Sequence, residues 1–214
     1  YVGHHLAQSL PKDVNIDAIK KNFNISDQKK VIAILPGSRK SEIKYHGRPL
    51  IDFINLYKKG NEDSEIVLAL NKLEDMPEIF KGIKDKIKIV FGETQKVLSM
   101  ADIAVVASGT ATLEAAILAK PMVVIYKSNL ISNFILSNFF LKSKYISLPN
   151  ILSQSEIVPE LRQNKVTGLE ILSKVNSVFL SESKIINQLS SLKDNLLVND
   201  SAKFSRAIKK LILE

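Results

Sequence analysis

The chain has 214 residues, of which 45% are hydrophobic, so it is long and apolar enough to bury a sizeable core in one large domain or two small ones. It contains no cysteine and only three histidines, which excludes disulfides, a thiol nucleophile and cysteine-ligated zinc and argues against metal catalysis. A formal net charge of +8 favours anionic partners, and because the basic residues are not clustered with aromatic ones, we expect phosphates or an acidic membrane face and no nucleic acid.

The first residues, YVGHHLAQ, carry neither an initiator methionine nor a charged-then-apolar leader. We therefore expect no signal peptide and a piece of a longer gene product. His4 or His5 could carry a proton, but no serine or carboxylate partner can be placed beside them from spacing. Adjacent histidines are more often turn or surface residues, so this second reading is favoured.

Short apolar runs that do not alternate with polar residues recur along the chain, separated by helix-length spacers. Such runs are typical of a parallel sheet that is covered on both faces, so the sequence predicts an α/β, doubly wound fold. The predicted strands are Val31–Leu35, Glu65–Leu70, Lys86–Phe91, Ile103–Ala107, Met122–Tyr126 and, more weakly, Tyr145–Leu148.

Helices fit the gaps between these strands. The sequence predicts one that opens at Pro49 as its first residue, one over Thr94–Met100 and one over Thr110–Leu118. After about Thr167 the strand signals stop, and residues 166–214 predict two or three amphipathic helices.

The stretch LPGSRKSE follows the first predicted strand, where parallel sheets bind ligands. Gly37 allows a close backbone approach, Ser38 offers a hydroxyl, and Arg39 offers a planar fork suited to phosphate oxygens. A plain strand-end turn with a surface arginine explains the same residues equally well.

A second turn, ASGTATLEA, starts a helix directly at the end of a strand. Ser108, Gly109 and Thr110 would give free N–H groups and hydroxyls to a phosphate. Glu114 lies one helical turn further on and could accept two hydrogen bonds from a ribose diol, or it could simply face solvent. The turn differs from G-x-G-x-x-G, which occurs nowhere in the chain and so disfavours NAD.

The segment from Asn129 to Leu148 is the longest apolar piece, yet it is too short and too polar to span a bilayer. Its apolar side chains, including those of Phe134–Phe140, fall around most of a helical wheel and are flanked by Lys127, Lys142 and Lys144. A buried inter-domain helix explains these residues almost as well as an interfacial helix does, but we favour membrane contact.

A third stretch, SLPNILSQSEIVPELRQ, carries Asn150, Glu160 and Gln163 in a loop that Pro149 and Pro159 would stiffen. Amide side chains can bind sugar hydroxyls or phosphates, although loops of this composition are common.

Four stretches, in this order, resemble the lipid-A-disaccharide synthase family, bacterial glycosyltransferases of the GT-B class: VGHHL, LPGSRKSEI, ADIAVVASGTATLEAAILAKPMVVIY and SLPNILSQSEIVPELRQ. The match spans residues 1 to about 165, and the helical remainder is compatible with it. The resemblance implies a Rossmann-like donor-nucleotide-binding domain over residues 1–165. Residues 166–214 would form a helical segment that packs on this domain or on an N-terminal half absent from the chain.

The resemblance also implies an activity. Family members transfer 2,3-diacylglucosamine from UDP-2,3-diacylglucosamine to 2,3-diacylglucosamine 1-phosphate, giving lipid A disaccharide 1-phosphate and UDP, without a metal or organic cofactor. The chain would supply the UDP-donor half and would be inactive without the acceptor-side half. We expect a cytoplasmic location with peripheral attachment to the bacterial inner membrane through the region Phe134–Phe140.

Site residues carry over from the family by position. Arg39 would contact the donor diphosphate and stabilise charge on the leaving UDP, with Gly37 and Ser38 in the same turn. Glu114 would bind the uridine ribose. The phosphate-facing helix start would consist of Ser108, Gly109, Thr110 and Thr112. Asn150, grouped with Arg39 as catalytic, and Gln163 would line the cleft near sugar or phosphate groups.

The chain departs from the family pattern near its first residue. The usual Gly-His-Pro-Leu reads Gly-His-His-Leu, with Gln8 where an acidic residue is commoner, so no role is assigned to that proline or acid. Alternatives are another UDP-sugar GT-B enzyme, such as a cell-wall glycan-lipid transferase or a UDP-N-acetylglucosamine epimerase, and a non-catalytic nucleotide-binding module.

Overall fold

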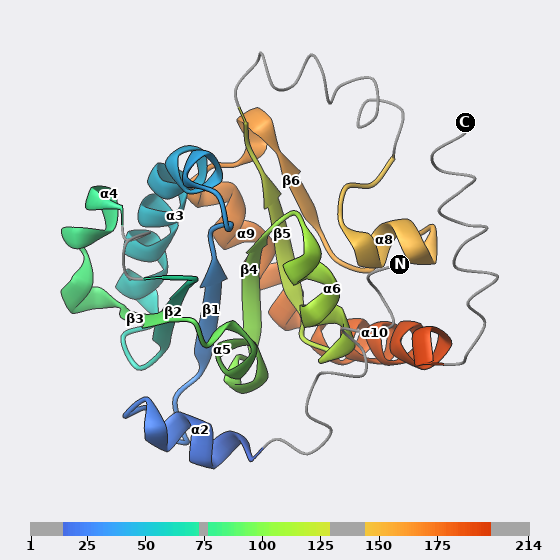
Figure 1. Ribbon diagram of the computed structural model, residues 1–214, viewed down its shortest axis with the longest axis horizontal. Helices are drawn as coiled ribbons and strands as arrows, with labels where there is room; N and C mark the ends of the chain where they lie inside the picture. Colours follow the sequence, from blue (N-terminus) through green and yellow to red (C-terminus); the bar gives the residue numbers. More distant parts are fainter. Residues whose placement is uncertain (1–14, 73–76, 129–143, 198–214) are drawn as a thin grey trace.

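The computed structural model describes residues 15–72, 77–128 and 144–197, which form a six-stranded sheet with helices on both faces (Figure 1). The strands are β1 Val31–Leu35, β2 Glu65–Leu70, β3 Lys88–Phe91, β4 Ile103–Ala107, β5 Met122–Tyr126 and β6 Glu160–Arg162. They lie in the order β3-β2-β1-β4-β5-β6, and every neighbouring pair is parallel. The predicted α/β, doubly wound class is confirmed.

Helices cover the sheet on two sides, which is why its central strands are apolar throughout. Every residue of β1 and of β4 is buried. Helix α3 (Lys40–Gly60) packs on α9 (Gly168–Leu180), which contacts β4 and β5 and lies behind the sheet in Figure 1. Helices α5 (Thr94–Met100) and α6 (Thr110–Ile117) lie in front, and α10 (Glu182–Leu197) packs on α6.

The remaining described elements are short. They are the helices α2 Ile16–Asn22, α4 Glu78–Lys81 and α8 Leu148–Ser153 and the 3₁₀ turns η2 Lys84–Lys86 and η3 Gln163–Lys165. The chain thus winds from β1 outward to β3 and then returns to the other side of β1 to build β4, β5 and β6. The direction of winding changes between β1 and β4, where open α/β sheets form their ligand crevice.

The sixth strand was predicted in the wrong place. Residues 145–147 form no strand, α8 begins at Leu148, and the sixth strand is Glu160–Arg162. The backbone N–H groups of Ile146 and Ser147 donate to the carboxylate of Glu160, each at 2.9 Å, so a side chain satisfies them instead of a neighbouring strand.

The helix predicted to open at Pro49 begins nine residues earlier, at Lys40, and Pro49 lies inside it. Proline is favoured at the first position of a helix, because at an interior position it removes one backbone hydrogen bond. The prediction followed this preference, which the present helix does not obey. The actual start is fixed by Glu42, whose carboxylate accepts backbone N–H groups just before the helix. Elsewhere α5 has the predicted bounds, α6 ends one residue early, and β3 starts two residues late, after η2.

Helices α9 and α10 confirm the predicted helical character of residues 168–197. Their apolar residues belong to the core of the sheet, since Ile171, Val175 and Leu189 are buried in it. The predicted division at residue 165 stays a prediction. His4, His5 and the region Phe134–Phe140 lie outside the described residues. Within the described ranges, no helix is both long and apolar enough to cross a membrane.

Candidate functional site

The turn after β1 is built around Gly37. Its φ of 120° lies in the left-handed region, and a Cβ there would come within 2.6 Å of the Oε2 atom of Glu42, so glycine alone fits. Arg39 is the N-cap residue of α3, and its side chain is 80% exposed. The guanidinium group is therefore open to solvent above the carboxyl edge of the sheet.

Glu42 occupies the backbone donors of this turn. Its Oε2 atom accepts the N–H groups of Ser38 at 3.0 Å and of Arg39 at 3.2 Å, and its Oε1 atom lies 3.5 Å from the Arg39 guanidinium. The Arg39 guanidinium, which the sequence assigned to phosphate oxygens, thus already lies beside a carboxylate of the same chain. A bound phosphate at these N–H groups requires Glu42 to move.

The turn after β4 is tied to its surroundings by its side chains. The Ser108 hydroxyl donates to the carbonyl of Ile146 at 2.9 Å, and the fully buried Thr112 donates to the carbonyl of Gly109 at 2.7 Å. Gly109 and Thr110 are exposed, and a Cβ on Gly109 would meet no described atom within 4 Å. Open backbone at a helix start therefore faces the space beyond the sheet.

Glu114 lies one turn into α6 and is half-buried. Burial raises the pKa of the Glu114 carboxyl above its usual value, because desolvation disfavours the charged form. In the described part of the chain, nothing donates a hydrogen bond to this carboxylate or pairs with it. Hydrogen bonds donated by a ligand would favour the charged form of Glu114 and offset the desolvation that raises the pKa.

His46 connects the two sides of the crevice. Its Nδ1 atom lies 2.7 Å from the carbonyl of Pro36, after β1, and its Nε2 atom accepts the N–H of Lys127, after β5, at 3.0 Å. These two bonds define a neutral imidazole with its proton on Nδ1. Burial is the main cause that lowers the pKa of His46, which keeps the ring neutral.

Glu160 organises the loop before α8. Its side chain is 6% exposed, and Arg162 pairs with it at 2.9 Å. The carboxylate also accepts hydrogen bonds from the backbone N–H groups of Ile146 and Ser147, from the Ser147 hydroxyl and from the Asn150 amide. This buried carboxylate is well satisfied, as burial of a charge requires. It fixes the loop whose Ile146 carbonyl holds Ser108.

Asn150 is fully buried, and all four of its hydrogen-bonding positions are used within the protein. Its Nδ2 atom donates to the carbonyl of Val158 and to Glu160, and its Oδ1 atom accepts the N–H groups of Ile157 and Val158. The side chain therefore fastens α8 to the start of β6. A direct contact with a ligand stays a prediction.

Gln163 follows β6 with a left-handed backbone, and its Oε1 atom accepts the N–H of Ser128 at 3.3 Å. Because Ser128 follows β5, this bond places Gln163 at the carboxyl edge of the sheet. The turns after β1 and β4 lie at the same edge on neighbouring strands, since Leu35 pairs with Val106. The fold thus brings together all the predicted site segments that it describes.

The arrangement offers an exposed cation, a helix start with open backbone and an unpartnered carboxylate, a set that suits an anion joined to a diol. Within the described ranges, no three His, Cys, Asp or Glu side chains are placed to hold a metal ion. The sequence reasoning missed the roles of Glu42, His46 and Arg162. A Glu at the third position of a helix that follows a Gly turn was the available signal for Glu42.

Comparisons with known proteins match nearly the whole chain. A family model described as lipid-A-disaccharide synthetase matches residues 1–212. A lipid-A-disaccharide synthase from Cellvibrio japonicus is 33% identical over 99% of this chain and 57% of its own length. One from Colwellia psychrerythraea is 32% identical over 97% of this chain and 54% of its own length. The chain thus spans little more than half of these curated relatives.

Solved structures share the fold at low sequence identity. ADP-heptose LPS heptosyltransferase II from E. coli superposes with a TM-score of 0.58 at 16% sequence identity. The match covers 82% of this chain and 57% of the heptosyltransferase. UDP-GlcNAc 2-epimerase from Neisseria meningitidis, bound to UDP-GlcNAc, covers 91% with a TM-score of 0.54 and 16% identity, the chain covering 48% of it.

Proposed function

The chain belongs to the lipid-A-disaccharide synthetase family, and from this premise we propose that it is the UDP-donor-binding part of a glycosyltransferase of lipid A biosynthesis. The whole enzyme transfers 2,3-diacylglucosamine from its UDP derivative to 2,3-diacylglucosamine 1-phosphate and releases UDP. In the relatives, the part of the protein that this chain does not cover would bind the acceptor sugar. Turnover therefore needs more than the present 214 residues.

The unpartnered carboxylate of Glu114 is the observation that carries the proposal. It is half-buried beside an open helix start, and its pKa is raised by desolvation alone. A ribose diol supplies two O–H donors, which would favour the charged form and offset that cost. In this role Glu114 favours a nucleotide whose sugar carries both ribose hydroxyls. The adjacent backbone N–H groups of Gly109 and Thr110 donate to a phosphate of the same ligand.

Arg39 acts on the diphosphate. Its guanidinium is exposed at the crevice, and its present partner is Glu42 at 3.5 Å. As the bond between sugar and diphosphate breaks, negative charge grows on the leaving UDP, and a cation fixed nearby stabilises that charge. The crevice residues of this part bind and stabilise, and the general base belongs to the acceptor side.

Thr112 and Asn150 are positioning residues in this proposal. The Thr112 hydroxyl holds the carbonyl of Gly109, and Asn150 holds Glu160 and the loop that anchors Ser108. Neither side chain needs to touch the donor in order to matter, because both set the geometry of the turn after β4. Gln163 sets the end of β5 in the same way through Ser128.

Calorimetric titration of the folded chain with UDP, with ADP and NAD⁺ as comparison ligands, tests the proposal. We expect selective binding of UDP and a loss of about tenfold or more in Arg39→Ala and in Glu114→Gln, since each removes charge-assisted hydrogen bonds. Matched controls are Arg48→Ala, an exposed arginine further along α3, and Glu170→Gln, an exposed glutamate in the first turn of α9.

Equal affinity for UDP in the Glu114 variant and the parent chain would remove the ribose contact from the proposal. If the folded chain binds no UDP, the titration is repeated with a protein that spans the full length of the relatives. Binding that is still absent there would overturn the assignment. Disaccharide formation by that longer protein, lost in Arg39→Ala, is the expected result for activity.

A further inference from the structure

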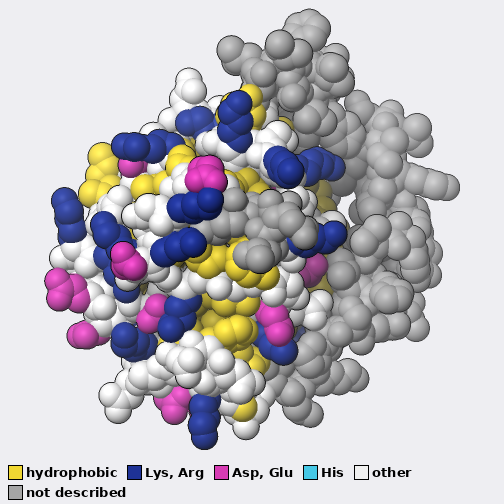
Figure 2. All heavy atoms as spheres, turned by 60° about the vertical axis from the view of Figure 1, so that its left-hand side comes forward, with side chains coloured by type: hydrophobic (Ala, Val, Ile, Leu, Met, Phe, Trp, Pro, Cys, Tyr) yellow, Lys and Arg dark blue, Asp and Glu magenta, His cyan; other side chains and the backbone are white. Residues whose placement is uncertain are grey.

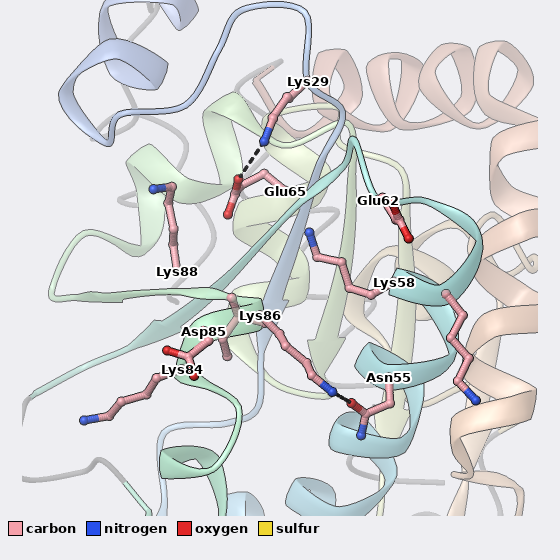
Figure 3. A pocket seen from close by; sticks show the side chains of 11 residues that line it. Lys29, Asn55, Lys58, Glu62, Glu65, Lys84, Asp85, Lys86 and Lys88 are labelled. Atoms are coloured by element: carbon pink, nitrogen blue, oxygen red, sulfur yellow. Dashed lines mark hydrogen bonds and ion pairs between the residues drawn. The ribbon is translucent and has the colours of Figure 1, made fainter.

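A groove of about 950 Å³ lies at the amino ends of the first three strands, away from the crevice (Figure 3). It is bounded by the last turn of α3, the start of β2, and η2 with the start of β3. In Figure 2, which brings forward the left-hand side of Figure 1, many Lys and Arg side chains are scattered over this side among hydrophobic ones, with Asp and Glu between them.

Lysine dominates the lining of the groove. Its cationic members are Lys29, Lys58, Lys59, Lys84, Lys86 and Lys88. Three carboxylates, those of Glu62, Glu65 and Asp85, share the lining and leave an excess of positive charge. Glu65 is already paired with Lys29 at 3.7 Å. In the described part of the chain, the other five lysines have no carboxylate oxygen within 4 Å.

Two of these ammonium groups are held in place by neutral oxygens. Lys58 donates to the carbonyl of Ser64 at 2.5 Å, and Lys86 donates to the side-chain oxygen of Asn55 at 2.6 Å. Figure 3 shows Lys86 reaching across from η2 to α3. Each bond restricts a long side chain without neutralising its charge. Less side-chain conformational entropy is therefore lost when these lysines bind an anion.

The dipole of α3 explains only part of this arrangement. Lys58 and Lys59 lie in the last turn of the helix, where cations offset its partial negative charge. Lys84, Lys86 and Lys88 belong to a different segment, and no long helix ends there. These three lysines line the same groove from a second segment, so the dipole of α3 does not account for them and a ligand of the groove would.

We propose that this groove binds a soluble anion with two or more phosphate groups. Its volume falls in the range of small-molecule sites, and several separate ammonium groups match a ligand with separate phosphates. A soluble source fits better than a lipid headgroup, because the chain leaves β5 and returns at Lys144 at the opposite edge of the sheet. The described residues that flank the apolar segment predicted to face lipid therefore lie at the other edge.

Calorimetry with inorganic tripolyphosphate, a probe without nucleoside or lipid, tests the proposal. We expect binding that weakens as salt is added and that falls about tenfold in Lys58→Ala/Lys86→Ala. Lys59→Ser/Lys84→Ser, at two exposed positions, should weaken it too without disturbing the Ser64 and Asn55 contacts. Lys174→Ser/Lys184→Ser on α9 and α10 is the control of equal charge, and it should bind like the parent chain.

Tripolyphosphate binding that both groove variants leave unchanged, or no binding at all, would overturn the proposal. A second result would show that the anion is a lipid headgroup and not a soluble molecule. In that case the parent chain binds vesicles with anionic headgroups, the groove variants do not, and tripolyphosphate fails to bind. Because UDP is assigned to the other edge, the groove variants should bind UDP normally, so failure here is distinguishable from failure of the proposed function.

Discussion

Glu42 shows how a single side chain sets the resting state of the proposed site. Its carboxylate takes the backbone donors of Ser38 and Arg39 and pairs with the Arg39 guanidinium. A donor diphosphate bound as proposed would therefore compete with Glu42 for the same groups. The sequence indicated the anion-binding character of the turn, but it could not show that the protein supplies its own anion, because that depends on a rotamer.

Shortening or neutralising Glu42 should therefore strengthen UDP binding. In Glu42→Asp the charge remains but the shorter side chain reaches Ser38 poorly, and in Glu42→Gln the competing charge is gone. We expect UDP to bind about three- to tenfold more tightly to both variants, as calorimetry would measure. If Glu42→Gln gains affinity and Glu42→Asp does not, charge repulsion and not occupancy is the cause, and the competition model is wrong.

His46 makes the stability of the fold depend on pH. Its folded pKa lies below the ordinary 6.5, because the ring is buried, so between these two values the unfolded chain binds more protons than the folded one. The free energy of unfolding should therefore fall as the pH drops below about 6.5. The slope due to one such group is at most about 1.4 kcal/mol per pH unit.

Urea unfolding between pH 5.5 and 7.5 measures this slope. We expect His46→Gln to flatten it within this window, while His4→Gln/His5→Gln keeps it. An unchanged slope in His46→Gln would mean that another group causes the pH dependence and that the folded chain does not disfavour protonation of His46.

At the scale of elements, strands were predicted better than helix starts. A buried parallel strand needs only a continuous apolar run, and Val31–Leu35 and Ile103–Ala107 show this without ambiguity. Residues 145–147 also look like a strand, but the carboxylate of Glu160, thirteen or more residues away, accepts the N–H groups of Ile146 and Ser147. A short apolar run does not reveal a side-chain partner at such a distance, so the sixth strand was misplaced.

Gly168 fixes how closely α9 approaches α3. A Cβ at this position would lie 2.7 Å from backbone atoms of Asp52 and Phe53, so Gly168→Ala must push the two helices apart. We expect a loss of about 1–3 kcal/mol in the free energy of unfolding, measured by urea denaturation. Gly60→Ala, where a Cβ would meet nothing within 4 Å, is the matched control and should change stability little. A neutral Gly168→Ala would mean that the packing of α3 on α9 is loose.

In the whole molecule, the proposed nucleotide site and the lysine groove lie at opposite edges of the sheet. At the carboxyl edge, the turns after β1 and β4 meet at the change of winding direction. The sequence placed both turns after strands, where parallel sheets bind ligands, but the strand order that makes them neighbours comes from the structure. The lysine groove at the amino edge was not anticipated, because its members are spread from residue 29 to residue 88. Scattered lysines in a sequence show net charge, and only the fold shows where they gather.

The predicted membrane attachment also belongs to this scale. In the sequence, Phe134–Phe140 falls between Ser128 and Lys144, two residues at the carboxyl edge, so the predicted lipid contact would bring the crevice near a bilayer holding the proposed acylated substrates. Burial of a phenylalanine ring in lipid is worth about 2 kcal/mol, so loss of two rings should release the protein.

Vesicle flotation with anionic lipids measures this attachment. The parent chain should rise with the vesicles, and Phe134→Ser/Phe140→Ser should stay at the bottom of the gradient. Lys59→Ser/Lys84→Ser should still float, because the groove faces the other edge and we assign it to a soluble anion. Flotation that persists without the two rings would move the lipid contact elsewhere. Flotation lost only in the lysine variant would place the amino edge, and not the crevice, against the membrane.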